Sequence, residues 1–265
     1  MSAAVEIRQL VRRFGDLVAV AELDLTVESG VLFGLLGSNG AGKTTVLRVL
    51  TTLLPPTSGN ASVAGFDVVA RPREVRRRIG YVPQLVSADG TLTARENLVL
   101  SAKLHGLPRT LREERIEDAF STMGLANAAD ELVRTFSGGM IRRLEIAQAM
   151  LHRPAVLFLD EPTVGLDPTA RHAVWDRLRD LQARLATTIV LTTHDMQEAD
   201  ALCARIAILH RGKIVADGAP AALKTQVKPD ATLDDVFAHF TGGSVEAGGD
   251  YRDIARTRRT AERLG

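Results

Sequence analysis

The stretch that decides the fold of this chain reads Gly37-Ser38-Asn39-Gly40-Ala41-Gly42-Lys43-Thr44-Thr45. It fits the phosphate-binding pattern of a glycine, any four residues, and then Gly-Lys-Ser/Thr. A short apolar run over residues 31–36 precedes it, and apolar residues at helical spacing follow it from Val46 to Leu54, where Pro55 stops the pattern. The spacing therefore predicts a buried strand, a glycine-rich loop and a helix, in that order.

Each residue type in this loop suits a phosphate. Glycines allow the backbone to take positive φ, so that several N–H groups converge on one anion. The first turn of the following helix adds unpaired N–H donors and a partial positive charge. Lys43 is placed to bring a full cation to the β and γ phosphates, and the Thr44 hydroxyl to bind Mg²⁺. The loop therefore predicts nucleotide binding.

The composition sets limits on the class of protein. A chain of 265 residues that is 45% hydrophobic can bury a large core. Its 33 basic and 32 acidic residues give no indication of nucleic acid as an obligatory partner, and we expect none. A single cysteine, Cys203, excludes an internal disulfide and suits a reducing compartment. We see no leader sequence and no apolar run near 18 residues, so we expect a cytoplasmic chain that does not itself cross a membrane.

The residues before the loop alternate between apolar and polar side chains. This pattern predicts two half-buried strands, joined by a turn at Phe14-Gly15-Asp16. Phe14 is a core residue in one interpretation and an exposed stacking face for a purine in the other, because its neighbours in the turn are polar. Further strands are expected over residues 61–68 and 79–84, and the second of these ends on Gln84.

Residues 92–135 change character and are expected to be helical. Thr93 and Glu96 have the spacing of a capping box, and Thr110 is expected to open a second helix that continues from Leu111 to Met123. Ser137 is then placed to cap another helix, whose first turn at Gly138-Gly139 carries no side chains. Such a bare helix N-terminus is a second candidate anion site, although Ser-Gly-Gly alone is a common turn.

Two buried-strand runs end on chemically active side chains. Residues 155–159 lead into Asp160 and Glu161, and residues 188–193 lead into His194. One carboxylate suits Mg²⁺ or its water shell, and the next suits a water molecule that must be polarised. Because ligands gather at the carboxyl ends of parallel strands, we expect these side chains to meet Gln84 at one edge of the sheet.

The C-terminal part is simpler. A hairpin is expected over residues 206–216, and a short amphipathic helix over residues 232–240. We therefore divide the chain into a nucleotide-binding domain over residues 1–240, with a helical insert at about 85–135, and a linker with a basic tail over residues 241–265. A solvated tail is the default interpretation, and contact with a partner or with anionic lipid is the alternative.

Five motifs in a fixed order carry a resemblance: the loop, Gln84, Phe136-Ser137-Gly138-Gly139-Met140, the Asp160-Glu161 pair and His194. The chain resembles the ATP-binding subunit of ATP-binding cassette (ABC) transporters over about residues 5–240, and most of all the drug-export branch related to daunorubicin-resistance ATPases. The resemblance implies an α/β P-loop NTPase fold. Its RecA-like, mostly parallel core sheet would carry an N-terminal antiparallel β subdomain and an inserted α-helical subdomain.

The resemblance also implies a role for each motif by position. ATP would be held by Phe14, Val20, Gly37, Ser38, Asn39, Gly40, Ala41, Gly42, Lys43, Thr44 and Thr45. Mg²⁺ and its waters would be organised by Thr44, Gln84 and Asp160. Glu161 would be the general base, and His194 would contact the γ-phosphate. Ser137, Gly138 and Gly139 would complete the site of a second copy, with Asp167 near the interface between the copies.

These roles imply a homodimer at the cytoplasmic face of the membrane, where an integral permease contacts the transported small molecule. Phe14 replaces the tyrosine that is usual in the family, and Phe136 and Met140 replace leucine and glutamine, but no phosphate donor is lost.

Three rival functions remain. They are a P-loop kinase, a non-transport ABC ATPase that acts on ribosomes or DNA, and a nucleotide-gated scaffold without catalysis.

Overall fold

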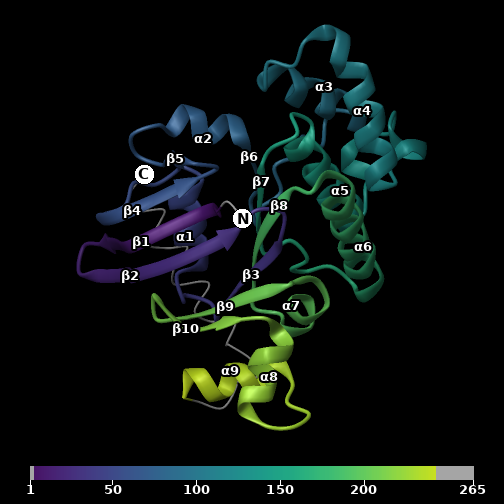
Figure 1. Cartoon of the computed structure of the whole chain (residues 1–265). Coiled ribbons are helices and arrows are strands. Elements are labelled where there is room, and N and C mark those ends of the chain that lie inside the picture. The colour runs from purple at the N-terminus through teal and green to yellow at the C-terminus, as the bar shows by residue number, and fades with distance from the viewer. Residues whose placement is uncertain (1–2, 243–265) are drawn as a thin grey trace.

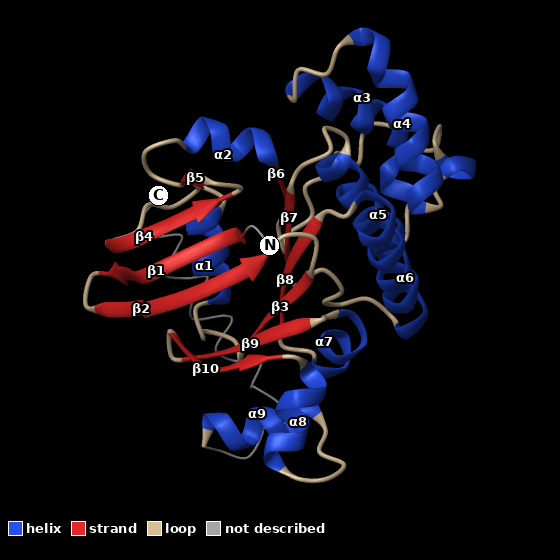
Figure 2. Ribbon diagram, in the orientation of Figure 1, coloured by secondary structure: helices blue, strands red, loops and turns tan. Residues whose placement is uncertain are grey.

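The computed structural model describes residues 3–242, and its strands form two sheets (Figure 2). The first sheet has the order β2-β1-β4-β5, and the second has the order β10-β9-β3-β8-β7-β6. The ten strands in the described part of the chain are β1 (Ala3–Phe14), β2 (Leu17–Glu28), β3 (Leu32–Leu36), β4 (Ser58–Val63), β5 (Phe66–Asp67), β6 (Ile79–Val82), β7 (Val156–Asp160), β8 (Thr188–Thr193), β9 (Arg205–His210) and β10 (Lys213–Gly218).

The six-stranded sheet is the mostly parallel core that was expected. Strands β6, β7, β8, β3 and β9 pair in parallel, and only β10 is antiparallel to its neighbour. Every residue of β3, β7 and β8 is buried, as expected for strands that are covered on both faces. The register places Leu36 beside Thr193 and Asp160 beside Thr192, so the ends of these three strands lie at one edge.

The four-stranded sheet is antiparallel. β1 and β2 form a long hairpin, and β4 pairs with the other edge of β1. The single strand expected over residues 61–68 is wrong, because a turn at Ala64 and Gly65, both with positive φ, divides it into β4 and β5. A glycine adopts this conformation readily, which explains why the strand reverses at this point.

Helices cover the core sheet and extend from it at both ends (Figure 1). α3 and α4 form a helical arm at one end, α8 and α9 lie at the other, and α5 and α6 flank β7 and β8. The helices are α1 (Lys43–Leu50), α2 (Pro72–Arg78), α3 (Ala94–Leu104), α4 (Arg109–Met123), α5 (Gly138–Met150), α6 (Pro168–Leu185), α7 (Met196–Leu202), α8 (Pro220–Val227) and α9 (Leu233–Thr241), with 3₁₀ turns at Ala126–Ala128 and Val133–Thr135.

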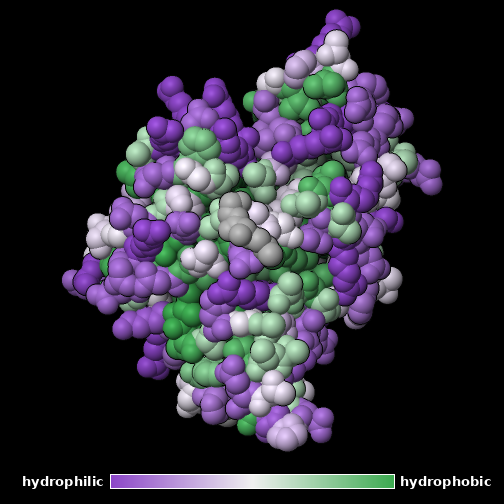
Figure 3. Space-filling model, viewed as in Figure 1, coloured by the Kyte–Doolittle hydropathy of each residue, from purple (hydrophilic) through white to green (hydrophobic). Residues whose placement is uncertain are grey.

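Buried side chains form two hydrophobic clusters on opposite faces of the core sheet. Alternation along β3 sends Phe33 and Leu35 to the cluster shared with α1 and the antiparallel sheet. Leu32 and Leu36 point to the cluster shared with α5, α6 and the helical arm. In the view of Figure 3, apolar side chains show in the middle of the face and over the arm, between largely polar margins.

Two helix boundaries and one strand end differ from the sequence-based predictions, since β6 ends at Val82 and not at Gln84. α1 ends at Leu50, so Leu53 lies outside the helix and is exposed. α4 begins at Arg109, directly after Pro108, and the Thr110 hydroxyl does not cap it. The short helices α7 and α8 were not predicted. The capping box at Thr93 and Glu96 is confirmed.

Two further features concern the termini and the single thiol. The predicted linker and basic tail lie, from residue 243 onward, outside the described residues. Within residues 3–242, no helix is both long and apolar enough to span a bilayer.

Cys203 follows α7 and is buried, and burial raises the pKa of its thiol, so it remains protonated and unreactive.

Candidate active site

The glycine-rich loop connects β3 to α1 at the carboxyl edge of the core sheet. Gly42 precedes the helix with φ of 110°, and a Cβ atom there would lie 2.5 Å from the carbonyl oxygen of Ala19. Lys43 folds back over the loop, and its Nζ donates to the carbonyl oxygens of Gly37 at 2.6 Å and Ser38 at 3.2 Å. No side chain caps α1, so its first N–H groups are available to an anion.

A cavity of about 370 Å³ lies over this loop. Its lining residues come from the β1–β2 hairpin, the loop, the segment after β6 and the end of β7: Phe14, Leu17, Ala19, Ser38, Asn39, Gly40, Ala41, Gly42, Lys43, Thr44, Thr45, Gln84 and Glu161. Gly37, the first residue of the motif, is buried beneath the loop. Segments that are far apart in the sequence therefore converge on one anion-binding cavity.

Asp160 ends β7 next to Thr44. The Thr44 hydroxyl donates to Oδ1 of Asp160 at 3.2 Å, and the Thr192 hydroxyl donates to the same oxygen at 2.6 Å. Asp160 is only 1% exposed, so its carboxylate is shielded from solvent. A hydroxyl and one carboxylate, with Gln84 lining the same cavity as Thr44, fit Mg²⁺, because this ion is usually held by one or two carboxylates together with waters and phosphates.

Glu161 is buried and lies between two cationic side chains, the buried Lys43 and the exposed His194. Its Oε1 is 3.1 Å from Nζ of Lys43, and its Oε2 is 2.5 Å from Nδ1 of His194. Burial raises the pKa of Glu161, but the hydrogen bond from His194 and the charge of Lys43 outweigh burial, and the net shift is downward. The hydrogen bond to Glu161 in turn raises the pKa of His194.

The backbone at Glu161 is strained. Its φ is 51°, a region that residues with a Cβ atom rarely adopt. The Glu161 N–H group donates to the carbonyl oxygen and to the hydroxyl of Thr192, at 3.1 and 3.0 Å, and these bonds hold the conformation. Strain of this kind is concentrated at functional sites. The geometry suits a carboxylate held ready beside a phosphate.

The two side chains that were expected beside adenine, Phe14 and Val20, differ in placement. Phe14 is 43% exposed and lines the cavity, with the Arg12 guanidinium 4.7 Å from its ring centroid. The structure thus favours the exposed alternative for Phe14. Val20 is fully buried and does not line the cavity, whereas Leu17 and Ala19 do. Side chains alternate along β2, so Ala19 faces outward where Val20 faces the core.

The Ser137-Gly138-Gly139 segment is not brought to this cavity. Ser137 is exposed, and its hydroxyl accepts a hydrogen bond from the Met140 N–H group, as the capping pattern predicted. Asp167 likewise caps α6 by accepting from Ala170. A Cβ atom on Gly139 would lie 2.8 Å from that of Ala170, so glycine allows α5 and α6 to start in close contact. Ser137 therefore caps its own helix and does not line the nucleotide cavity of its own chain.

One functional contributor was missed from the sequence. The Thr192 hydroxyl donates to the Asp160 carboxylate and accepts from the Glu161 N–H group, although in the sequence Thr192 is only one residue of a buried strand. The pairing of β7 with β8 places these residues together, and this pairing is not apparent from either strand alone. Among residues 3–242, no group of three or more His, Cys, Asp or Glu side chains forms a metal cluster.

A glycine-rich loop that follows β3 of a mostly parallel sheet, with a buried acidic pair at the end of β7, defines a P-loop nucleotide hydrolase of the α/β class. The ABC transporter family model matches residues 20–164. The chain belongs to this family, and as such it is an ATPase. This result confirms the predicted fold class and family.

Individual proteins agree with this assignment. The chain is 45% identical over 221 residues to the Nod factor export ATP-binding protein I of Burkholderia lata, covering 83% of this chain and 72% of that protein. It is 45% identical over 224 residues to the daunorubicin/doxorubicin resistance ATP-binding protein DrrA of Streptomyces peucetius, covering 84% and 68%. A solved ATP-binding subunit of an ABC transporter superposes with a TM-score of 0.79 at 30% identity, covering 90% of this chain and 99% of that one.

Proposed function

We propose that this chain is the ATP-binding and ATP-hydrolysing subunit of an exporter and drives a separate membrane-spanning permease. The contact of Glu161 with both Lys43 and His194, at the edge of the phosphate loop, carries the proposal. Lys43 and the loop N–H groups bind the phosphates, and Phe14 stacks on the base. Thr44, Gln84 and Asp160 hold Mg²⁺, which supplies charge stabilisation at the β and γ phosphates when bound.

Glu161 is positioned to orient the attacking water and to accept its proton. Its lowered pKa keeps it ionised, so it is ready to act as a base at neutral pH. His194 donates to Glu161, and through this contact it is held where it can reach the γ-phosphate. Phosphoryl transfer needs mainly alignment and charge stabilisation, and these residues supply both.

A second copy completes the site. Ser137 is exposed at the N-terminus of α5 and does not line the cavity of its own chain. A helix N-terminus with Ser137, Gly138 and Gly139 at its tip suits the γ-phosphate held by another copy. ATP then joins two copies, with Asp167 near their interface, and hydrolysis loosens them. This cycle converts ATP turnover into movement of an attached protein.

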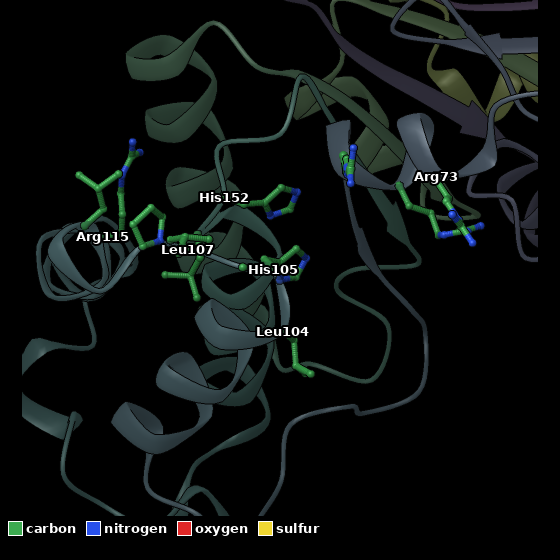
Figure 4. A pocket seen from close by; sticks show the side chains of 12 residues that line it. Arg73, Leu104, His105, Leu107, Arg115 and His152 are labelled. Atoms are coloured by element: carbon green, nitrogen blue, oxygen red, sulfur yellow. The ribbon is translucent and has the colours of Figure 1, made fainter.

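The permease docks on the face that carries the helical arm. Exposed apolar side chains follow β6, at Leu85 and Val86, and lie along α3, at Leu100 and Leu104. Leu104 also lines a cavity of about 740 Å³ between α2 and the α3–α4 connection. Figure 4 shows His105 and His152 close together in it, with Arg73 and Arg115 on either side. This mixture of apolar and cationic groups fits an amphipathic, acidic segment of the permease at the cytoplasmic face of the membrane.

The cargo is a hydrophobic compound or drug. This part of the proposal comes from the relatives, whose names describe Nod factor export and daunorubicin resistance. The transported molecule contacts the permease and not this chain. Co-purification from gently solubilised membranes identifies the permease, and compounds that raise ATP turnover of that complex identify the cargo.

The substitution Glu161→Gln tests the catalytic role. It keeps the shape of the side chain and removes the base, so we expect turnover to fall about 10²–10⁴-fold while ATP still binds and traps a dimer. The control is Glu114→Gln, the same change at an exposed position on α4. Normal steady-state hydrolysis by the Glu161→Gln variant would refute the role. Stimulation of hydrolysis by ribosomes or DNA, in place of a permease, would favour the non-transport alternative.

A further inference from the structure

A buried ion pair on α5 holds the segment that contains Gln84. Arg142 and Glu145 are 6% and 2% exposed, and their side chains approach to 3.1 Å. The Arg142 guanidinium donates to the carbonyl oxygens of Pro83 at 2.8 Å and Gln84 at 3.0 Å. Glu145 Oε1 accepts from the N–H group of Ser87 at 2.5 Å and from its hydroxyl at 3.0 Å.

Stability alone does not explain this pair. Removing two charges from water costs several kcal/mol per ion, and an apolar pair of similar volume is often at least as stable. Here both charges are instead directed to the backbone of one short segment, one at each end of residues 83–87. A guanidinium that donates to two successive carbonyl groups fixes their orientation, which a lysine ammonium does less well.

The held segment has two opposite faces. The side chain of Gln84 lines the nucleotide cavity. Leu85 and Val86, between the two anchors, are 82% and 63% exposed and point away from the protein. The same helix begins at Ser137, five residues before Arg142 in the sequence. α5 thus joins a nucleotide-facing glutamine, an outward apolar pair and the exposed serine.

We propose that Arg142 and Glu145 are positioning residues that fix residues 83–87 to α5, so that Gln84, the Leu85–Val86 pair and Ser137 move as one unit. The inference rests on the proposed function, which gives Gln84 its metal and Ser137 its second nucleotide. A permease that presses on Leu85 and Val86 thereby shifts Ser137 and Gln84 together. Metal binding in one copy and closure onto the other are then coupled through one helix.

The test compares Arg142→Lys with Arg143→Lys. Arg143 is the next residue of α5, but it donates to the carbonyl oxygens of Met123 and Gly124 at the end of α4, away from Gln84. We measure ATP turnover against free Mg²⁺ concentration. Without nucleotide or metal we also measure amide hydrogen exchange over residues 83–87, which should be faster in Arg142→Lys and unchanged in Arg143→Lys. Arg142→Lys should raise the Mg²⁺ concentration for half-maximal turnover by about 10-fold or more, and Arg143→Lys should leave it unchanged.

Gln84→Ala shows whether the effect passes through Gln84. If Arg142 acts through Gln84, then adding Arg142→Lys to a Gln84→Ala protein should change the Mg²⁺ concentration for half-maximal turnover very little. The reason is that the Gln84 side chain, through which Arg142 acts, is already absent. The double variant Arg142→Met with Glu145→Met leaves no unpaired buried charge, so it should fold as stably as the wild type and still show the shift. This variant separates positioning from stability.

The outcomes that overturn the inference are distinct. Equal Mg²⁺ shifts in Arg142→Lys and Arg143→Lys, or additive shifts with Gln84→Ala, would refute the positioning role alone. Wild-type Mg²⁺ dependence in Gln84→Ala would instead refute the metal role of Gln84, and with it both the inference and that part of the proposed function. If turnover in the Arg142→Met, Glu145→Met double variant depends on Mg²⁺ as it does in the wild type, the ion pair does not position residues 83–87.

Discussion

Glu198 on α7 allows a prediction whose size follows from its contacts. The side chain is 1% exposed, and its Oε1 accepts from the Thr163 hydroxyl at 2.7 Å and from Nε1 of Trp175 at 3.1 Å. Thr193 also bonds to the carboxylate. Thr163 lies in the loop between Glu161 and Asp167, so Glu198 ties this loop to α6 and to the strand that leads into His194.

Two substitutions separate its hydrogen bonds from its charge. Glu198→Leu leaves three buried donors, on Thr163, Trp175 and Thr193, without an acceptor, at about 1–3 kcal/mol each. The expected loss of about 3–9 kcal/mol is a large part of the roughly 5–15 kcal/mol by which a folded domain is usually stable. Glu198→Gln keeps one oxygen in place for the donors on Thr163 and Trp175, so at neutral pH it should be close to wild type or more stable.

The free energy of unfolding should also depend on pH through Glu198, which gives a second measurement. Burial raises the pKa of Glu198 above its ordinary value of 4.5, despite its hydrogen bonds, so the folded protein binds this proton more tightly than the unfolded chain. Its contribution to stability is therefore full below the ordinary glutamate pKa and is lost as pH rises through the raised value. Glutamine does not ionise, so the Glu198→Gln variant does not lose stability in this way as the pH rises.

Trp175 is the only tryptophan in the chain and reports unfolding by its own fluorescence. Urea titrations at several pH values should show wild type falling relative to Glu198→Gln as pH rises, and Glu198→Leu the least stable throughout. The reasoning fails if Glu198→Leu matches Glu198→Gln, or if the difference between wild type and Glu198→Gln does not change with pH.

Three other substitutions have expected outcomes. Gly42→Ala should abolish ATP binding in equilibrium dialysis, because its Cβ atom would lie 2.5 Å from the Ala19 carbonyl oxygen, and normal affinity would contradict this geometry. Phe14→Ala should weaken ATP binding by about 1–3 kcal/mol of lost stacking, and Phe14→Trp should restore it; equal affinity in all three proteins would exclude stacking. Thr93→Ala should destabilise α3 by about 1 kcal/mol through loss of its cap, seen as faster amide exchange over residues 94–104 only.

The nucleotide loop and the buried strands could be predicted because their signals are local. A fixed pattern with glycines and one lysine specifies the loop, and fully apolar runs specify β3, β7 and β8. α7 was missed because seven residues give little periodicity, although Asp195 caps it by accepting from Gln197 and Glu198. The turn at Gly65 was missed because apolar residues of strand type stand on both sides of it, at Val63 and Phe66.

Contacts between distant segments were harder to predict. Val20 and Ala19 are neighbours, and only the pairing of β2 with β1 decides which one faces the cavity. The same holds for Arg142, which the sequence presents as one of two adjacent arginines on a helix. Only the folded chain shows that one of them binds the carbonyl of Gln84 and the other the end of α4.

The buried thiol of Cys203 has a practical consequence. As the only sulfhydryl group in the chain, 6% exposed and held protonated, it should not react with maleimide or methanethiosulfonate labels under mild conditions. A cysteine introduced at an exposed position such as Leu85 would then be the sole labelled site. Spin-label spectroscopy on that variant could record how far two copies separate during each turnover, without first removing any native residue.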